Sequence, residues 1–150
     1  MADDLAHIGH VAETVGLSLR TIRYYEEIGL VTPSGRTSGG FRLYNSEDID
    51  RLLLIKRMKP LGYPLEEMAR LLRLMDALTG TTATNFPKGA EQDSAEQDGA
   101  EQTLSAAEAA EALRTYAQAV TDRIVDLQTK VAYAEEFRDR ILAELARYSA

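Results

Sequence analysis

The chain has 150 residues, no cysteine and a formal net charge of −7. This length suits one or two small domains, and 45% hydrophobic residues are enough to form a core. Without cysteine there are no disulfides and no thiolate metal sites. The N-terminus lacks the basic and apolar regions of a signal peptide, and no run approaches the roughly 18 apolar residues of a membrane helix. We therefore predict a soluble, cytoplasmic protein with no membrane partner.

The net charge is unevenly distributed along the chain. Residues 1–78 contain 10 Lys and Arg against 11 Asp and Glu, a net of −1, whereas residues 79–150 contain 7 against 13, a net of −6. From Arg20 to Arg73 the balance is 10 basic against 7 acidic residues, or +3. The N-terminal half therefore has a local positive field that suits a polyanion such as nucleic acid.

Two short helices are predicted near the N-terminus. The first covers residues 10–15 and ends at Gly16. Ser18 is a favourable N-cap for the second, which runs to about Ile28 and stops at Gly29. Two helices joined by a short turn that contains glycine are the signature of a helix-turn-helix.

A β-hairpin is predicted after the second helix. Residues 32–40, TPSGRTSGG, are rich in turn-forming residues and contain one arginine. They are flanked by Leu30-Val31 and by residues 41–44, which alternate apolar and polar side chains as a strand does. This arrangement predicts a hairpin with a flexible, basic tip.

Two further helices are predicted after the hairpin. Asn45 or Ser46 caps the third helix of the chain, whose apolar residues recur at helical spacing until Gly62. Pro64 opens the fourth helix, since proline is tolerated in a first helical turn.

Residues 79–103 differ from the rest of the chain in composition. They contain a degenerate five-residue repeat, GAEQD, SAEQD and GAEQ, without apolar periodicity. Such a sequence cannot bury enough apolar surface to fold by itself. We predict an acidic, low-complexity linker that separates a domain at residues 1–78 from a second element at residues 104–150.

The strongest pattern in the chain is the apolar periodicity of residues 104–148. Apolar or small residues recur at alternating steps of 3 and 4, with one double step across Arg138. This alternation is the heptad seam of a coiled coil, and a helix of this length extends about 65 Å. Self-association is the simplest way to bury the stripe, so we predict a homodimer. The predicted dimerisation residues are Leu113, Ala117, Val120, Ile124, Leu127, Val131, Ile141 and Leu145.

The second predicted helix carries a candidate nucleic-acid face. A start near Leu19 places Arg20, Arg23, Tyr24 and Glu27 on one side. The opposite side carries the predicted core residues Leu19, Ile22 and Tyr25. Two guanidinium groups and a phenol near the positive end of a helix dipole suit contacts to phosphates and base edges. The alternative is an ordinary solvated amphipathic helix. Glu26 and Glu27 support that alternative, because they repel phosphate unless they point away from it.

The predicted hairpin adds a second basic surface. Arg36 at the tip and Arg42 on the returning strand form a basic wing beside the helix-turn-helix. Taken alone, a surface loop with incidental arginines is the simpler interpretation, but the position directly after a helix-turn-helix favours winged-helix DNA binding. Lys56, Arg57 and Lys59 form a further basic cluster that either contacts phosphates or keeps the domain soluble. The predicted fold is mainly α: a winged helix-turn-helix domain followed by a long coiled-coil dimerisation helix.

Three motifs carry a resemblance to a known family. They are TIRYYEEIGL at residues 21–30, the R-x-x-x-G-x-R-x-Y pattern at residues 36–44, and LGYPLEE at residues 61–67. In this order and spacing they resemble the DNA-binding domain of the MerR family of bacterial transcriptional regulators, over about residues 7–75. The resemblance implies a homodimer with an antiparallel coiled coil and two heads on a pseudo-palindromic promoter site. It also implies that DNA bending and untwisting realign the promoter elements for RNA polymerase.

The resemblance further implies which residues contact double-stranded promoter DNA. From the second helix they are Ser18, Arg20, Thr21, Arg23 and Tyr24. From the wing they are Arg36, Arg42 and Tyr44, and from a second wing region they are Lys59 and Tyr63.

The chain departs from the family pattern beyond its N-terminal half. In metal- and oxidant-sensing members, cysteines beyond the dimerisation helix bind the effector, and this chain has no cysteine. The sequence identifies no small-molecule effector and no cofactor, and His7 and His10 lack the further ligands of a metal site. No catalytic motif is present, so we predict that the protein is not an enzyme. The alternatives to a regulator are a protein-interaction adaptor and a DNA-bending accessory factor.

Overall fold

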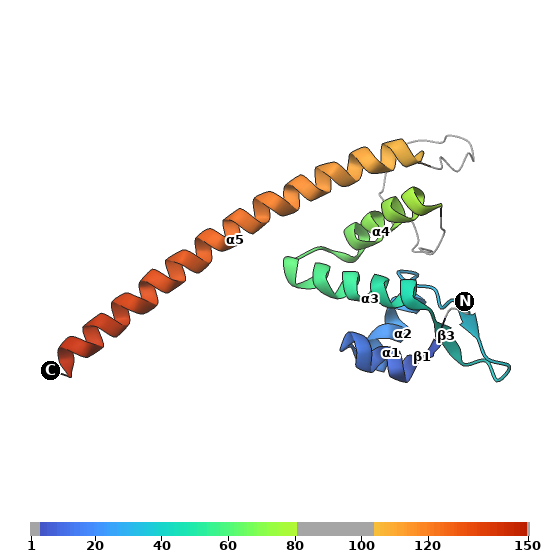
Figure 1. The fold of residues 1–150 in the computed structure, drawn as a ribbon, viewed down its shortest axis with the longest axis horizontal. Coiled ribbons are helices and arrows are strands. Elements are labelled where there is room, and N and C mark those ends of the chain that lie inside the picture. The colour runs from blue at the N-terminus through green and yellow to red at the C-terminus, as the bar shows by residue number, and fades with distance from the viewer. Residues whose placement is uncertain (1–3, 81–103, 150) are drawn as a thin grey trace, which may run out of the picture. The chain divides into compact units, whose positions relative to one another are not determined.

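The computed structural model describes residues 4–80 and 104–149 (Figure 1). The chain divides into two compact units, Met1–Ala110 and Glu111–Ala150, and each is described by itself. We call residues 4–80 the head. In chain order the elements are β1 (Ala6–His7), α1 (Ile8–Val15), α2 (Leu19–Glu27), β2 (Gly35–Arg36), β3 (Arg42–Tyr44), α3 (Ser46–Met58), the short 3₁₀ helix η1 (Lys59–Leu61), α4 (Leu65–Thr79) and α5 (Ala106–Tyr148).

The predicted helix-turn-helix is confirmed as α1 and α2. Gly16 ends α1 in the left-handed conformation, with φ of 66°, and its N–H donates to the carbonyl of Ala12 at 2.9 Å. Ser18 caps α2, because its Oγ accepts a hydrogen bond from the backbone N–H of Thr21 at 3.0 Å. Local hydrogen bonding therefore fixes both ends of the turn.

The hairpin is present, but its first strand is not where the sequence predicted it. β2 pairs with β3, and β3 also pairs with the unpredicted strand β1, giving an antiparallel sheet of order β1-β3-β2. Leu30 and Val31 are instead buried in the loop after α2, where both backbone N–H groups donate to the carbonyl of Tyr25. Burial of this apolar pair in the core therefore took precedence over strand pairing.

The third and fourth helices confirm their predicted caps. Asn45 and Asp48 form a reciprocal capping box at the start of α3. α3 passes into η1, which ends at Gly62 in the left-handed conformation. Pro64 then occupies the N-cap of α4. In Figure 1, α3 lies between α4 and the α1–α2 pair.

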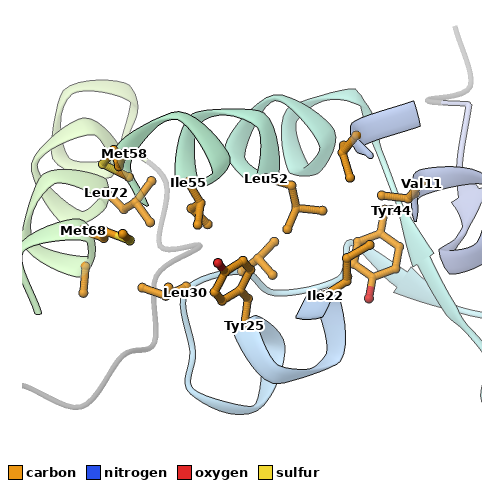
Figure 2. Packing of buried hydrophobic residues seen from close by; sticks show 13 residues of the cluster. Val11, Ile22, Tyr25, Leu30, Tyr44, Leu52, Ile55, Met58, Met68 and Leu72 are labelled. Carbon is orange, nitrogen blue, oxygen red and sulfur yellow. The ribbon is translucent and has the colours of Figure 1, made fainter. Parts of the chain in front are cut away.

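A single apolar cluster holds the head together. Side chains from α1, α2, α3, α4 and the hairpin meet in it (Figure 2). Its largest fully buried members include Tyr44, Ile22, Leu52 and Ile55. Burying each of the three aliphatic side chains, Ile22, Leu52 and Ile55, stabilises the fold by about 1.5–3 kcal/mol. This shared core holds α2 and the wing together.

The long helix predicted near residues 104–148 is confirmed as α5, a continuous helix of 43 residues. Ser105 and Glu108 cap its start with reciprocal hydrogen bonds. Exposed pairs such as Lys130–Asp126, at 2.8 Å, add local support one turn apart. Across residues 4–80 and 104–149, no helix is sufficiently long and apolar to cross a bilayer.

Candidate nucleic-acid interface

The two faces of α2 separate as the periodicity predicted, with one exception. Arg20, Arg23 and Tyr24 are exposed, whereas Ile22 and Tyr25 are buried. The adjacent tyrosines therefore have different surroundings: Tyr24 is 44% exposed and Tyr25 is 4% exposed. The exception is Leu19, which is 40% exposed and is not a core residue.

The two arginines of this face are available to a ligand. Within the described parts of the chain, neither Arg20 nor Arg23 forms an ion pair. Both lie in the N-terminal half of α2, where the helix dipole adds positive potential. Ser18 and Thr21 lie at the same end, and their hydroxyls are 2.8 Å apart in a hydrogen bond. The N-terminal end of α2 therefore presents an electropositive, hydrogen-bonding surface suited to an anion.

One concave surface joins α2 to the second wing region. Its lining comes from α2, from η1 and from the start of α4, with Arg20, Thr21, Tyr24, Lys59 and Tyr63 among its residues. Five predicted contact residues from segments about 40 residues apart in sequence thus share one surface. Lys59 and Arg20 supply two positive charges there, and Tyr63 is half-buried beside them.

The wing is fastened to α2 by Glu26. Its carboxylate accepts from the Nε of Arg42 and from an Nη of Arg36, the latter at 3.4 Å. Arg36 also donates to the carbonyl of Gly40 at 3.1 Å, across the hairpin turn. The Glu26 side chain is only 13% exposed. Glu26 is therefore paired with the wing arginines and is not a free surface carboxylate, whereas Glu27 is exposed.

The prediction that Tyr44 contacts DNA is wrong. Its side chain is fully buried in the core of the head (Figure 2). Burial raises the pKa of Tyr44 to about 12, and the nearby negative charge of Glu26 acts in the same direction. Strand alternation places residues 42 and 44 on the same side of β3, and this side passes from half-buried at Arg42 to fully buried at Tyr44. Tyr44 supports the wing from below and does not form its outer surface.

The basic cluster of α3 has two kinds of members. Lys56 donates from Nζ to the carbonyl of Val15 at 2.8 Å, so it caps the C-terminus of α1. Its charge there also complements the helix dipole. Arg57 and Lys59 are exposed, and only Lys59 lines the concave surface beside α2.

Two features of this region were missed by sequence reasoning. Asp48 is 6% exposed and accepts from both the N–H and the hydroxyl of Ser34, at 3.1 Å and 2.6 Å, which fixes the entry to the wing. Phe41 is 69% exposed beside the tip of the hairpin. An acidic side chain on a helix that precedes a wing with two arginines was the available signal for Glu26. The spacing of Asn45 and Asp48 was a local signal for the capping box, but no local signal identified the bonds of Asp48 to Ser34.

The predicted dimerisation residues lie along a single uninterrupted helix. Leu113 and Val120 are half-buried, and the others are exposed in α5. Ile124, Val131 and Leu145 are 49%, 58% and 56% exposed, which is unusual for aliphatic side chains repeated along one stripe. Tyr133 and Phe137 are also exposed and lie outside the seam.

Comparison with known proteins finds similarity concentrated in the head. Residues 7–74 match the model of the MerR HTH family of regulatory proteins. The mercuric resistance operon regulatory protein of Bacillus cereus is 45% identical over 69 residues, which is 46% of this chain and 52% of that protein. The chain thus spans about half the length of the curated relatives it matches.

Solved structures resemble a larger part of the chain at lower identity. HiNmlR, a MerR family regulator lacking the sensor domain and bound to promoter DNA, has a TM-score of 0.60 at 20% identity, over 87% of this chain and 85% of its own. A MerR family regulator from Listeria monocytogenes has a TM-score of 0.55 at 23% identity, over 97% and 86%. At these identities the likeness establishes the fold.

Proposed function

The N-terminal domain, over residues 7–74, belongs to the MerR family of helix-turn-helix regulatory proteins, and from this premise we propose that the protein is a DNA-binding transcriptional regulator. In this proposal it acts as a homodimer on a pseudo-palindromic promoter site and is not an enzyme. The observation that carries the proposal is the exposed arginine face of α2, flanked by the wing arginines and by Lys59 of the second wing region.

The proposed protein–DNA contacts are of two kinds: those that read the bases, and those to the phosphate backbone that position the protein on the duplex. Arg20, Arg23 and Tyr24 stand on the face of α2 that enters a major groove, where arginine pairs with the O6 and N7 of guanine. Phosphate positioning falls to Ser18 and Thr21 at the start of α2 and to cationic residues outside it. These outer residues are Arg36, Arg42 and Lys59, with the hydroxyl of Tyr63 beside Lys59.

The homodimer is supported by the exposed stripe of α5. A solvent-exposed helix with aliphatic residues at heptad spacing is stabilised when a second helix covers the seam. The seam is mostly small near its N-terminus, where Leu113 lies among Ala106, Ala110 and Ala117, and bulkier near its C-terminus, at Ile141 and Leu145. Antiparallel pairing sets large against small side chains and fills the interface evenly, which supports that orientation over a parallel one.

The promoter is the proposed site of action. One protein of similar fold is described as a MerR family regulator bound to promoter DNA. We infer that this protein also binds between promoter elements and distorts the spacer, so that RNA polymerase is affected indirectly through the DNA.

Titration of DNA binding against salt tests the proposal. The full-length protein is mixed with a duplex that it has selected from a random-sequence pool, and with unselected duplex of the same length. We expect a preference for the selected duplex and an affinity that falls steeply with salt, because phosphate contacts release counterions. Arg23→Ala should cost about 1–3 kcal/mol of discrimination, while Lys59→Ala should weaken both duplexes alike and reduce the salt slope by about one.

Two controls separate this function from its alternatives. Arg140→Ala removes an exposed arginine of α5 and should leave both affinities unchanged. A protein that selects no sequence and prefers no duplex is not a regulator of this kind, and the adaptor interpretation then gains. Transcription in vitro from a long-spacer promoter that contains the selected site distinguishes a regulator from a DNA-bending accessory factor, which binds without changing the yield of transcript.

A further inference from the structure

We propose that Glu26 is a positioning residue for sequence discrimination: it locks the wing to the recognition helix α2 and fixes the spacing between their DNA contacts. This inference rests on the proposed function. It assigns a role to an acidic side chain that, by charge alone, opposes binding to a polyanion.

The geometry shows one carboxylate serving two arginines. Arg36 and Arg42 are register partners on β2 and β3, so their like charges lie directly opposite each other across the hairpin. Such a pair is destabilising by itself. The Oε1 of Glu26 accepts from Arg36, 10 residues away in sequence, and its Oε2 accepts from Arg42, 16 residues away. Glu26 therefore offsets the repulsion and joins both strands of the wing to α2.

Partial burial gives this contact more weight than an ordinary surface ion pair has. The side chain of Glu26 is 13% exposed, that of Arg42 is 31% exposed and that of Arg36 is 54% exposed. Solvent screening is weakest at the carboxylate, where the two pairs meet. The cluster also shares one ordered carboxylate between two pairs, so the side-chain entropy of Glu26 is lost once for both.

The arginines keep hydrogen-bonding capacity while Glu26 holds them. A guanidinium has five N–H donors, and Arg42 uses its Nε for Glu26. The donors on its two Nη atoms are those that reach a phosphate in a fork. Glu26 can thus orient Arg42 without competing for the groups that bind DNA.

Glu27 provides a matched control. It is the next residue on the same helix and carries the same charge, but it is exposed and is bonded to no wing arginine among the described residues. Replacing either glutamate by glutamine removes one negative charge near the DNA. Any purely electrostatic effect is therefore common to both variants, and a difference between them reports positioning.

The experiment measures affinities for the selected and unselected duplexes with full-length wild type, Glu26→Gln and Glu27→Gln. We expect Glu27→Gln to strengthen binding to both duplexes, with a smaller change in their ratio than Glu26→Gln causes. Glu26→Gln should lower the ratio about tenfold, equivalent to about 1.4 kcal/mol. In hydroxyl-radical footprints of Glu26→Gln, the DNA segment contacted by the wing should lose its protection from cleavage. The segment contacted by α2 should stay protected.

A double-mutant cycle guards against an effect of Glu26→Gln on folding. If Glu26 acts through the wing, adding Glu26→Gln to Arg42→Gln should change the ratio little further. Additive losses, or a Glu26→Gln variant that behaves like Glu27→Gln, would overturn the inference while leaving the proposed function intact. A wild type with no preference for any selected duplex overturns both, so the two failures are distinguishable.

Discussion

Asp48 offers a quantitative test of how the head fixes the entry to its wing. One oxygen of its buried carboxylate accepts three hydrogen bonds: from the N–H of Asn45 at 3.0 Å, and from the N–H and hydroxyl of Ser34 at 3.1 Å and 2.6 Å. Asp48→Ala removes all three. Half of a capping box is worth about 1 kcal/mol, and hydrogen bonds to a charged acceptor contribute about 1.5–3 kcal/mol each before the exposed Ser34 regains water. We expect a loss of about 2–4 kcal/mol in the free energy of unfolding.

Glu47→Ala is the control for this substitution. Glu47 lies in the same first turn of α3 and carries the same charge, but it is exposed. Its loss removes only a favourable interaction with the helix dipole, about 0.3–1 kcal/mol. Urea unfolding is followed by near-ultraviolet circular dichroism of the tyrosines at one fixed protein concentration, because the stability of the proposed dimer depends on concentration.

A difference of about 2 kcal/mol between the variants separates their urea midpoints by roughly 1 M. Ser34→Ala combined with Asp48→Ala should then cost little more than Asp48→Ala alone, since the same hydrogen bond is removed twice. Equal midpoints for Asp48→Ala and Glu47→Ala would refute the reasoning, because charge at the helix start would then explain the whole effect.

Three further predictions concern other parts of the chain. Tyr44→Phe should leave stability at pH 7 unchanged or raise it by up to about 1 kcal/mol, because the buried hydroxyl has no hydrogen-bond partner among the described residues. Since the pKa of Tyr44 is raised from 10.0 to about 12, the folded wild type retains a proton that the unfolded chain loses. Its unfolding free energy should therefore fall between pH 10 and 12 more steeply than that of Tyr44→Phe, and parallel curves would contradict this. Lys56→Met should lower the free energy of unfolding by about 1 kcal/mol in urea, because it removes the cap on α1. The salt dependence of DNA binding should keep the same slope. A reduced slope would make Lys56 a phosphate contact. Ile124→Glu should convert the proposed dimer to monomer in sedimentation, whereas Val125→Glu, at a more exposed position outside the seam, should not. A dimer that survives Ile124→Glu places the interface elsewhere.

Much of the head was predictable because its signals are local. Gly16, Ser18 and Asn45 act on backbone groups three or four residues away, so their hydrogen bonds follow from residue type and spacing. The same holds for the division of Tyr24 from Tyr25, which needs only the 100° turn per residue of an α-helix.

The errors occur where distant segments compete for the same core. Leu30 and Val31 have the composition of a strand, but both pack into the core of the head as buried loop residues. The sheet instead recruits β1, a strand of two residues that is too short to show periodicity. Tyr44 fits a surface contact by its position in a motif, and only the packing of the head shows that it is buried.

By itself the sequence determined the helices, their caps, the basic face of α2 and the heptad stripe of α5, because each depends on residues within one or two turns of one another. The tertiary structure alone decided what surrounds those elements. It brought Lys59 and Tyr63 beside Arg20, placed Lys56 at the end of α1, and set Glu26 between two arginines of the wing. Periodicity specifies which face of a helix is polar, but the partner of a charge is set by the packing of segments far apart in the chain. For that reason the arginines of the interface and Glu26 were visible in the sequence, but the pairing of Glu26 with two of those arginines was not.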